Sequence, residues 1–426
     1  MRVAAVDLGA TSARVAVVDS AQPDVVEVVH RYAHQPVVHR DGSLRWDWDR
    51  LVAEVEHGLE RAREAGPIDS IGVDTWGVDY GLIDHAGLLV AAPYSYRDPR
   101  TDGWRAIAER LGEKRLYAET GVQLMAINTI FQLAVHDRDE LARAAHVLML
   151  PELLVYHLTG AVTAEVTSAA TTGLVSLHTG TWDDELLFEI DVRRSLMADI
   201  AAPGTRVGAW HGVPVVLVGG HDTASAVYGR PAGRDDGRAF VATGSWVLVG
   251  VERPEPLTTR VARLANFSNE RSVDGGYRLL KNVTGLTLLE RCREQWPGAS
   301  LEAMLADAAR ARGGVVINTD DPRLLHAATV PKVVADLTEL DSEDRGAIVR
   351  CILESIAAAA AGVIDQIGHV TGDPITEVDL IGGGTKIPLL VQLMEDATAL
   401  PCTVGSAEAA ALGNARAQLT YFGTLQ

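Results

Sequence analysis

Apolar residues fill the strand-like segments that open the chain. Segment 2–7 is a largely apolar run that ends in Asp7, a pattern typical of a buried strand. A turn, "GATS", and a second apolar segment at 13–18 follow, so the pattern predicts a β-hairpin. The same order of apolar strand, small-residue turn and apolar strand returns at 239–252. We interpret the two hairpins as a weak internal repeat, with one hairpin opening each domain.

The remaining pattern alternates between strand and helix spacing. Apolar residues recur at helical spacing from Trp48 to Leu59, and either Asp47 or Asp49 would cap that helix. Alternation of strands and helices along the whole chain predicts the α/β class. Further strands are predicted at 69–74, 79–84 and 213–218, and segment 378–384 is predicted to be a strand that runs into a glycine loop. Further helices are predicted at 103–111, 129–143, 150–158, 342–370, 387–399 and 408–419.

Length and composition favour two domains. The chain has 426 residues, 47% of them hydrophobic, which is enough for two cores of roughly 200 residues each. A loop rich in glycine and charge, "GRPAGRDDGR", lies between the two hairpin repeats at 229–238. We therefore predict one domain over 1–230 and a second over 231–426.

The charge balance excludes some partners. With 57 acidic and 38 basic side chains the net charge is −19, a field that repels nucleic acid and anionic membranes. No stretch approaches the roughly 18 apolar residues of a membrane span, and the N-terminal apolar run is too short for a signal peptide. Cys292, Cys351 and Cys402 are widely spaced, which argues against a disulfide framework or a zinc site and favours core positions. A soluble cytoplasmic protein is therefore expected.

Glycine and hydroxyl residues gather in three turns at strand ends. The P-loop, Rossmann, HExxH and GxSxG motifs are absent from the sequence, but "DLGATS", "ATGSW" and "GGGTK" remain. Backbone N–H groups and hydroxyls in such turns can hold phosphate oxygens, and Arg14 would add positive charge near the first turn. Each could also be an ordinary tight turn. Three in one chain, two of them in matched hairpins, favour a nucleotide site.

Two carboxylates stand where predicted strands end. A buried carboxylate at Asp7 is costly unless it is paired or metal-bound, so Asp7 either holds Mg²⁺ through water or caps the local turn. Asp222 follows "VGG" and opens a predicted helix in "HDTASAV". It either caps this helix or accepts a proton from a substrate, and the helix N-terminus would hold it ionised.

The segment 71–84 combines polar groups with an aromatic ring. Trp76 lies between Asp74 and Asp79, and Gly77 would leave room for a ligand. A sugar needs hydrogen bonds and a flat apolar face, so this turn could bind one. The alternative is a β-turn with Trp76 packed in the core.

Two further polar stretches are interpreted as surface features. Asp98 and Arg100, in the loop 93–101, are expected to form a solvated salt bridge. The histidines at 30, 34 and 39 lie in a polar stretch without other metal-type ligands and are also expected at the surface.

Several of these segments together resemble the FGGY carbohydrate kinases, and within that family the rhamnulokinase branch. The pair "DTWGVDY" and "HDTASA" is specific to that branch, and the resemblance covers nearly the whole chain in order. The matching segments are "AVDLGATSAR" (5–14), "DSIGVDTWGVDYGLID" (69–84), "YRDPRT" (96–101), "GHDTASAV" (220–227), "LLKNVTGLTLLE" (279–290) and "IGGGTK" (381–386).

The resemblance implies a fold and a reaction. The fold is the two-domain actin, hexokinase and Hsp70 type, which is ribonuclease H-like and binds its ligands in a cleft between the domains. The implied reaction transfers a phosphoryl group from MgATP to L-rhamnulose. ATP and a small ketose are therefore the expected partners, and Mg²⁺ is the expected cofactor.

The same resemblance assigns roles residue by residue. Asp222 would be the catalytic base, and Asp7 would lie near the magnesium ion. The expected sugar-binding residues are Trp76, Gly77, His221, Asp222 and Thr223, and the expected ATP-binding residues are Ala10, Thr11, Ser12, Ala13, Arg14, Ser245, Asn282, Glu290 and Gly384.

The sequence departs from the family pattern around the nucleotide. Ser245 stands where threonine is common, Glu290 stands where glutamine is expected, and "GGGTKIP" replaces the usual "GGGxQN". Relatives usually continue further after "ALGNARAQL", so we expect some C-terminal helical structure to be absent or supplied by a partner. The alternative functions are a kinase for another ketose, such as L-fuculose or a pentulose, and a non-catalytic nucleotide-binding sensor or actin-like assembler.

Overall fold

The structure divides the chain into two compact units. The computed structural model describes residues 1–230, 237–296, 298–325 and 329–425. Unit 1 comprises Met1–Gly229, Arg253–Leu279 and Glu408–Gln426, and unit 2 comprises Arg230–Glu252 and Leu280–Ala407. Along the described residues, the chain therefore passes from one unit to the other more than once. Residues 231–236, most of the predicted interdomain loop, lie outside the described residues, and the predicted domain limits stay a prediction.

A six-stranded mixed sheet forms the centre of unit 1. Its strand order is β11-β12-β6-β1-β2-β3. The predicted opening hairpin is present, because β1 pairs with β2 in antiparallel register, and β1 also pairs in parallel with β6. The strands are β1 (Arg2–Leu8), β2 (Ser12–Asp19), β3 (Glu27–Ala33), β6 (Ser70–Thr75), β11 (Arg206–Trp210) and β12 (Val213–Val216).

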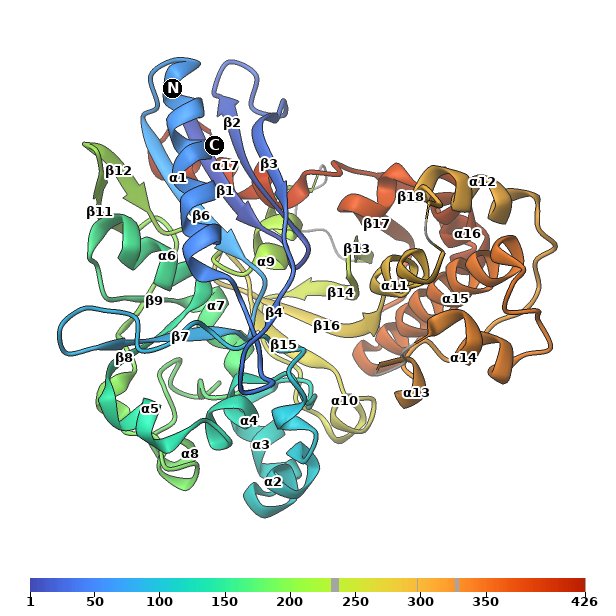
Figure 1. Ribbon diagram of the computed structural model, residues 1–426, viewed down its shortest axis with the longest axis horizontal. Coiled ribbons are helices and arrows are strands. Elements are labelled where there is room, and N and C mark those ends of the chain that lie inside the picture. The colour runs from blue at the N-terminus through green and yellow to red at the C-terminus, as the bar shows by residue number, and fades with distance from the viewer. Residues whose placement is uncertain (231–236, 297, 326–328, 426) are drawn as a thin grey trace. The chain divides into compact units, whose positions relative to one another are not determined.

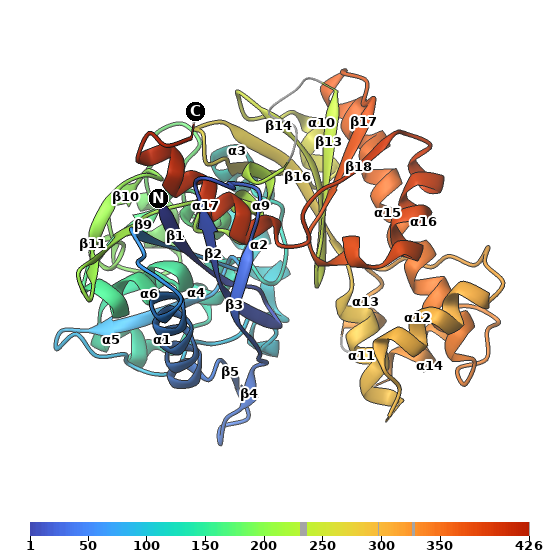
Figure 2. The same ribbon diagram turned by 90° about the horizontal axis from the view of Figure 1, so that it is seen from above.

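Helices cover both faces of this sheet. Helix α1 (Trp48–Glu64), capped by Asp47, packs so closely that a Cβ on Gly58 would lie 2.4 Å from Val15. On the other face, Ala16 and Val18 pack against α17 (Ala409–Tyr421), the last helix of the chain. Figures 1 and 2 both draw this helix, in red, beside the blue first strands. Distant parts of the sequence thus build one core.

Polar side chains of α17 reach into the same core. Gln418 donates through Nε2 to the carbonyl of Ala4 (3.0 Å), and its amide oxygen accepts from the hydroxyl of Ser70 (2.5 Å). Gly72 is needed beneath them, because a Cβ there would lie 2.4 Å from Asn414 Oδ1. The C-terminal helix is therefore fixed in register across β1 and β6.

The other elements of unit 1 surround this layer. The short strands are β4 (Val37–Val38), β5 (Leu44–Arg45), β7 (Tyr80–Asp84), β8 (Ala144–Met149), β9 (Ala164–Glu165) and β10 (Ile200–Ala201). The helices are η1 (Pro99–Thr101), α2 (Trp104–Leu111), α3 (Glu113–Thr120), α4 (Thr129–Ala134), α5 (Arg138–Arg143), α6 (Leu150–Thr159), α7 (Val166–Ala169), η2 (Ala170–Thr172), α8 (Asp184–Glu189), η3 (Arg194–Leu196), α9 (Asp222–Tyr228) and α10 (Arg260–Leu264).

The prediction of one helix over 129–143 was wrong. The structure has two helices there, α4 and α5. The reason is local, because the carboxylate of Asp137 accepts from the backbone N–H of Glu140 (2.9 Å) and so caps a new helix.

The second sheet repeats the pairing of the first. Its order is β15-β16-β14-β13-β17-β18, and β13 is antiparallel to β14 but parallel to β17, as β1 is to β2 and β6. This agrees with the internal hairpin repeat that the sequence predicts, and the α/β fold class is confirmed. The strands are β13 (Arg238–Thr243), β14 (Trp246–Arg253), β15 (Ser268–Arg271), β16 (Tyr277–Thr284), β17 (Glu377–Ile381) and β18 (Cys402–Val404).

Helices accompany this sheet in unit 2. The expectation that no stretch approaches a membrane span was wrong, because among the described residues one helix, α15 (Arg345–Thr371), is long and apolar enough to cross a membrane by length and composition. However, 61% of its most apolar window is buried within the protein, and it packs against α12 and α16, so it is a core helix. The helices of unit 2 are α11 (Thr287–Gln295), α12 (Leu301–Arg310), α13 (Pro322–Leu325), α14 (Val330–Leu337), α15 (Arg345–Thr371), η4 (Gly383–Lys386) and α16 (Pro388–Thr398).

Candidate active site

Three carboxylates gather at the carboxyl ends of parallel strands in unit 1. Asp7 on β1 and Asp74 on β6 stand directly opposite each other in the strand register, and both are fully buried. Asp222 is the first residue of α9, which follows the strand end at Gly220. Thr75 donates its backbone N–H to the carbonyl of Gly220 (2.9 Å), which brings α9 to the same edge. Ligand sites of open α/β sheets commonly form at this edge.

Asp7 is held by an arginine on one side only. Arg14 reaches its Oδ2 through Nε (2.8 Å) and through a terminal nitrogen (2.6 Å). Glu408 binds the same guanidinium at 3.2 Å. The other oxygen of Asp7, Oδ1, is buried without a hydrogen-bond partner. Burial raises the pKa of Asp7 despite the charge of Arg14.

Asp74 has a similar unpaired oxygen. Its Oδ2 accepts from Asn414 Nδ2 (2.7 Å), whereas Oδ1 is buried without a partner. Burial, followed by the negative charge of Asp7, raises its pKa well above the ordinary value. Sequence reasoning missed Asn414 as a partner, because it lies 340 residues away on the last helix and no local pattern links the two.

These carboxylates fit a magnesium ion held mainly by phosphates. The described residues contain no group of three or more His, Cys, Asp or Glu side chains that could hold a metal alone. Mg²⁺ in phosphoryl-transfer sites is typically held by one or two carboxylates, with phosphates and water completing the shell. The orphan oxygens of Asp7 and Asp74 meet that requirement.

Asp222 is accessible and poorly neutralised. Its side chain is 26% exposed, and Thr223 Oγ1 donates to it at 3.2 Å. His221 occupies the N-cap position of α9, so Asp222 is not the N-cap residue of this helix. Burial is the main influence and raises its pKa, only partly offset by His221. The expectation that the helix N-terminus holds Asp222 ionised stays a prediction.

His221 is fixed by two buried charges. Its Nδ1 lies 3.3 Å from Glu270 Oε2 and 3.4 Å from a terminal nitrogen of Arg278. Arg278 is fully buried and itself pairs with Glu270 (3.3 Å). Burial opposes ionisation of Glu270, but the hydrogen bond and charge of His221 and the charge of Arg278 lower its pKa. Sequence reasoning missed both residues, which stand on strands without a recognisable motif.

The turn after β6 lies beside His221. A Cβ placed on Gly77 would lie 3.3 Å from His221 Nε2 and 3.2 Å from Thr171, so the structure brings the three residues together. Trp76 is only 5% exposed, and its indole N–H donates to Asp79 (3.0 Å). Most of the Trp76 ring is therefore packed in the core, as the alternative interpretation expected, and only a small part of the ring is left to contact a ligand.

His34 contradicts the surface interpretation of the early histidines. Its ring stacks on Trp76 with centroids 5.4 Å apart, and its Nε2 lies 2.8 Å from the carbonyl of Gly9. Burial lowers its pKa to about 4. His34 directly follows β3, and its backbone N–H donates to the carbonyl of Thr11 (3.1 Å), which holds it against the first turn.

Asp98 and Arg100 lie within ion-pair distance (4.0 Å), but the expectation that their salt bridge is solvated was wrong. Asp98 is 6% exposed and accepts from the backbone N–H groups of Leu44 (2.7 Å) and Arg100 (2.9 Å). Arg100 donates to Gln132 (2.6 Å) and lies over the ring of Tyr94. Both residues therefore organise a buried loop.

The predicted nucleotide residues fall into two sets, one on each unit. Ala10 and Thr11 lie in the half-buried turn between β1 and β2, and Ser12, Ala13 and Arg14 begin β2. On unit 2, Ser245 lies in the turn between β13 and β14, Asn282 on β16, Glu290 on α11 and Gly384 in η4.

Three of the unit 2 segments lie side by side. The backbone N–H of Leu286 donates to Gly244 (3.0 Å), and that of Thr287 donates to Ser245 (3.2 Å), so α11 begins against the hairpin turn. Gly384 packs on the same hairpin, because a Cβ there would lie 2.6 Å from Thr243. The structure thus groups the segments that carry Ser245, Glu290 and Gly384.

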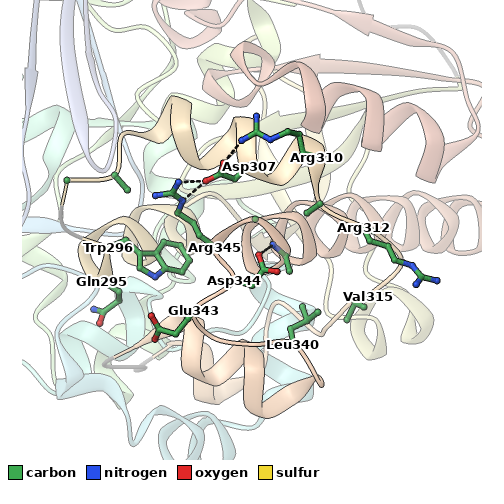
Figure 3. Close-up of a pocket in the computed structure, with 17 residues that line it drawn as sticks. Gln295, Trp296, Asp307, Arg310, Arg312, Val315, Leu340, Glu343, Asp344 and Arg345 are labelled. Carbon is green, nitrogen blue, oxygen red and sulfur yellow. Dashed lines mark hydrogen bonds and ion pairs between the residues drawn. The ribbon is translucent and has the colours of Figure 1, made fainter.

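A separate hollow of about 1310 Å³ lies elsewhere on unit 2. Figure 3 shows Arg310 and Arg345 on either side of Asp307 at its rim, with Trp296 nearby. None of the predicted site residues lines this hollow. Two of its arginines, Arg310 and Arg345, pair with Asp307 of the same rim.

Comparison with known proteins identifies relatives along the whole chain. The N-terminal domain of the FGGY family of carbohydrate kinases matches residues 2–229, and its C-terminal domain matches residues 239–421. A rhamnulokinase of Pectobacterium carotovorum is 37% identical over 441 residues, covering 99% of this chain and 88% of the relative.

Solved structures share the fold at lower identity. A ligand-bound xylulose kinase from Lactobacillus acidophilus has a TM-score of 0.79 at 15% identity, covering 100% of this chain and 90% of that one. Glycerol kinase of Plasmodium falciparum with ADP has a TM-score of 0.77 at 16% identity and the same coverage. These likenesses agree with the actin-like fold expected from the sequence.

Proposed function

The chain belongs to the FGGY family of carbohydrate kinases, and we propose that it phosphorylates L-rhamnulose with MgATP in L-rhamnose catabolism. The products are ADP and L-rhamnulose 1-phosphate. The observation that carries the chemistry is Asp222, a partly exposed carboxylate beside His221 and Gly77 at the strand edge. The similarity to rhamnulokinases, at 36–37% identity, supports the choice of sugar.

Asp222 acts as the base for the sugar hydroxyl. Phosphoryl transfer passes through a loose transition state, in which the enzyme mainly positions groups and neutralises charge. The hydroxyl proton passes to Asp222 as the bond to phosphorus forms. Partial burial makes that carboxylate a better proton acceptor, since its pKa is raised from the ordinary aspartate value.

Asp7 holds the magnesium ion, with Asp74 beside it. Bound Mg²⁺ neutralises the phosphate charge that develops during transfer. The salt bridge from Arg14 keeps one oxygen of Asp7 occupied and leaves Oδ1 for the ion or its water. Asp74 is turned by Asn414 so that its own Oδ1 is also left without a protein partner.

The sugar binds against the Gly77 turn and the start of α9. His221, oriented by Glu270, hydrogen-bonds a sugar hydroxyl, and Thr223 borders the same position. Gly77 leaves the space in which the sugar lies close to His221. Trp76 contributes the small exposed part of its ring.

Each unit carries its own set of proposed ATP-binding residues. The turn Ala10–Arg14 holds phosphate oxygens through backbone N–H and hydroxyl groups. Ser245, Asn282, Glu290 and Gly384 hold the nucleotide from unit 2. A cytoplasmic location fits this use of ATP, and nucleic acid and membranes are not expected partners at a net charge of −19.

A substrate panel tests the proposal. ADP release is measured with MgATP and L-rhamnulose, L-fuculose, L-ribulose, D-xylulose, glycerol or no sugar. A clear preference for L-rhamnulose is the expected result. Preference for another ketose would retain the kinase and replace the sugar, and ATP binding without turnover on any sugar would favour the non-catalytic sensor.

A further inference from the structure

A short segment of unit 1 touches both parts of the proposed sugar site. Helix α7 and the following turn η2 together span residues 166–172. Thr171 lies against Gly77, and its hydroxyl accepts from the backbone N–H of Val78 (3.4 Å). At the other end, the hydroxyl of Thr167 accepts from the backbone N–H of His221 (3.2 Å). Movement of this segment would therefore move the neighbours of Asp222.

The buried side chain of Glu165 holds this segment in place through hydrogen bonds. A single oxygen, Oε2, accepts four hydrogen bonds, and the residue is 1% exposed. Three donors belong to the segment itself: Thr167 N (2.9 Å), Thr167 Oγ1 (2.6 Å) and Ser168 N (3.1 Å). The fourth is the backbone N–H of Gly220 (2.9 Å), two residues before Asp222. A helix cap needs only the donors of the helix, so the bond to Gly220 goes beyond capping.

A second buried carboxylate lies next to Glu165. Glu152 is also 1% exposed, and its Oε1 accepts from the backbone N–H of Glu165 (2.9 Å). Its Oε2 lies 3.2 Å from the hydroxyl of Ser168. Within the described part of the chain, no lysine, arginine or histidine forms an ion pair with either carboxylate. Two unpaired negative charges at this depth would be very costly, so one of the two carries a proton.

We propose that Glu165 is a positioning residue, whose charge holds Gly220 and His221 so that Asp222 meets the sugar, and that Glu152 stays protonated beside it. The donors decide which residue carries the charge. Four donors converge on Glu165, whereas a protonated Glu152 can donate to Ser168 while accepting from the Glu165 amide. This inference rests on the proposed kinase function and deepens it.

The arrangement predicts a loss of activity at alkaline pH. Burial and the charge of Glu165 raise the pKa of Glu152 to about 8. Above that pH the second charge appears beside Glu165 and pushes the segment away from Gly220 and His221. A displacement of about 1 Å at a reacting group can cost on the order of a hundredfold in rate.

Variants of the anchor test the positioning role. Glu165→Gln keeps the shape but removes the charge, and Thr167→Val removes the hydroxyl that links Glu165 to His221. We expect kcat to fall about 10–100-fold with an unchanged KM for ATP, and Thr167→Ser to restore it. Glu140→Gln, which removes a half-buried carboxylate paired with Arg45, is the matched control and should keep normal kcat. Normal kcat in the folded Glu165 and Thr167 variants would overturn the proposal.

The pH profile tests the proton on Glu152. Glu152→Gln imitates the protonated carboxyl, because its amide can donate to Ser168 while its oxygen accepts from Glu165. It should therefore be active at neutral pH and lack the wild-type fall in kcat above about pH 8. An identical alkaline fall in both proteins, or no fall in the wild type, would overturn this part. The test remains informative if Glu165→Gln does not fold.

Hydrogen exchange separates this proposal from the function on which it rests. The amide protons of Gly220 and His221 should exchange about tenfold faster in Glu165→Gln, and that of His221 also in Thr167→Val, but neither should change in Glu140→Gln. Unchanged exchange would overturn the anchor even if the kinase is active. Wild-type protein that turns over no sugar would refute the function, while faster exchange in the variants would still support the anchor.

Discussion

Replacing Asp222 with asparagine removes the proposed base with little change in shape. Asparagine can still accept from Thr223, which lies 3.2 Å away, so the start of α9 should be preserved. Burial already disfavours the charged form of Asp222, so loss of the charge should leave the melting temperature unchanged or slightly higher. The variant therefore separates chemistry from folding.

The expected cost lies in the chemical step. Removal of a general base typically lowers kcat by about 10²–10⁴-fold. At about 1.36 kcal/mol per tenfold change, this corresponds to roughly 2.7–5.4 kcal/mol of transition-state stabilisation. The KM for ATP should stay close to the wild-type value, because Asp222 is expected to contact the sugar.

A coupled ADP assay with L-rhamnulose, together with a thermal melt, measures both effects. The wild-type kcat should also fall as pH decreases through the pKa of Asp222, which burial holds above the ordinary aspartate value of about 3.9. A folded Asp222→Asn protein whose kcat is within about threefold of wild type would refute the role of base.

Three further substitutions test other parts of the account. Gly77→Ala places a Cβ 3.2 Å from Thr171, so KM for the sugar should rise several-fold while ATP binding, measured by calorimetry, is unchanged. Asp7→Asn should raise the Mg²⁺ concentration needed for half-maximal rate by at least about tenfold without lowering the melting temperature, and an unchanged Mg²⁺ titration would contradict the metal role. Glu140 accepts hydrogen bonds from His136 and Arg45. The bond to His136, with further contributions from Arg45, lowers the pKa of Glu140 to about 2. The stability it adds is present above the unfolded pKa of about 4.3 and is lost as pH falls towards 2. Glu140→Gln should therefore melt below the wild type at pH 7, and this gap should narrow between pH 5 and pH 3.

Local sequence patterns predicted the main elements correctly. The hairpins at 2–18 and 239–252 were found because apolar runs around a small-residue turn are a short-range signal. The family resemblance is confirmed by matches to both FGGY domains. The roles of the site residues stay predictions, although the structure brings Gly77 and His221 together as the proposal requires.

Long-range partners could not be predicted in this way. Asn414 reaches Asp74 across 340 residues, and Glu165 reaches Gly220 across 55. Such pairs depend on how helices pack over the sheet, which hydrophobic spacing does not encode. The position of His34 was predicted wrongly for the same reason, because its ring stacks on Trp76 in the turn after β6.

Identification of the product tests the central claim most directly. The purified protein is incubated with MgATP and L-rhamnulose, and the phosphorylated product is examined by phosphorus NMR and mass spectrometry. The account predicts a sugar monophosphate esterified at the C1 hydroxyl, formed in equal amount with ADP by the wild type and nearly absent with Asp222→Asn. ADP formed without a phosphorylated sugar, or phosphate attached at another hydroxyl, would contradict it.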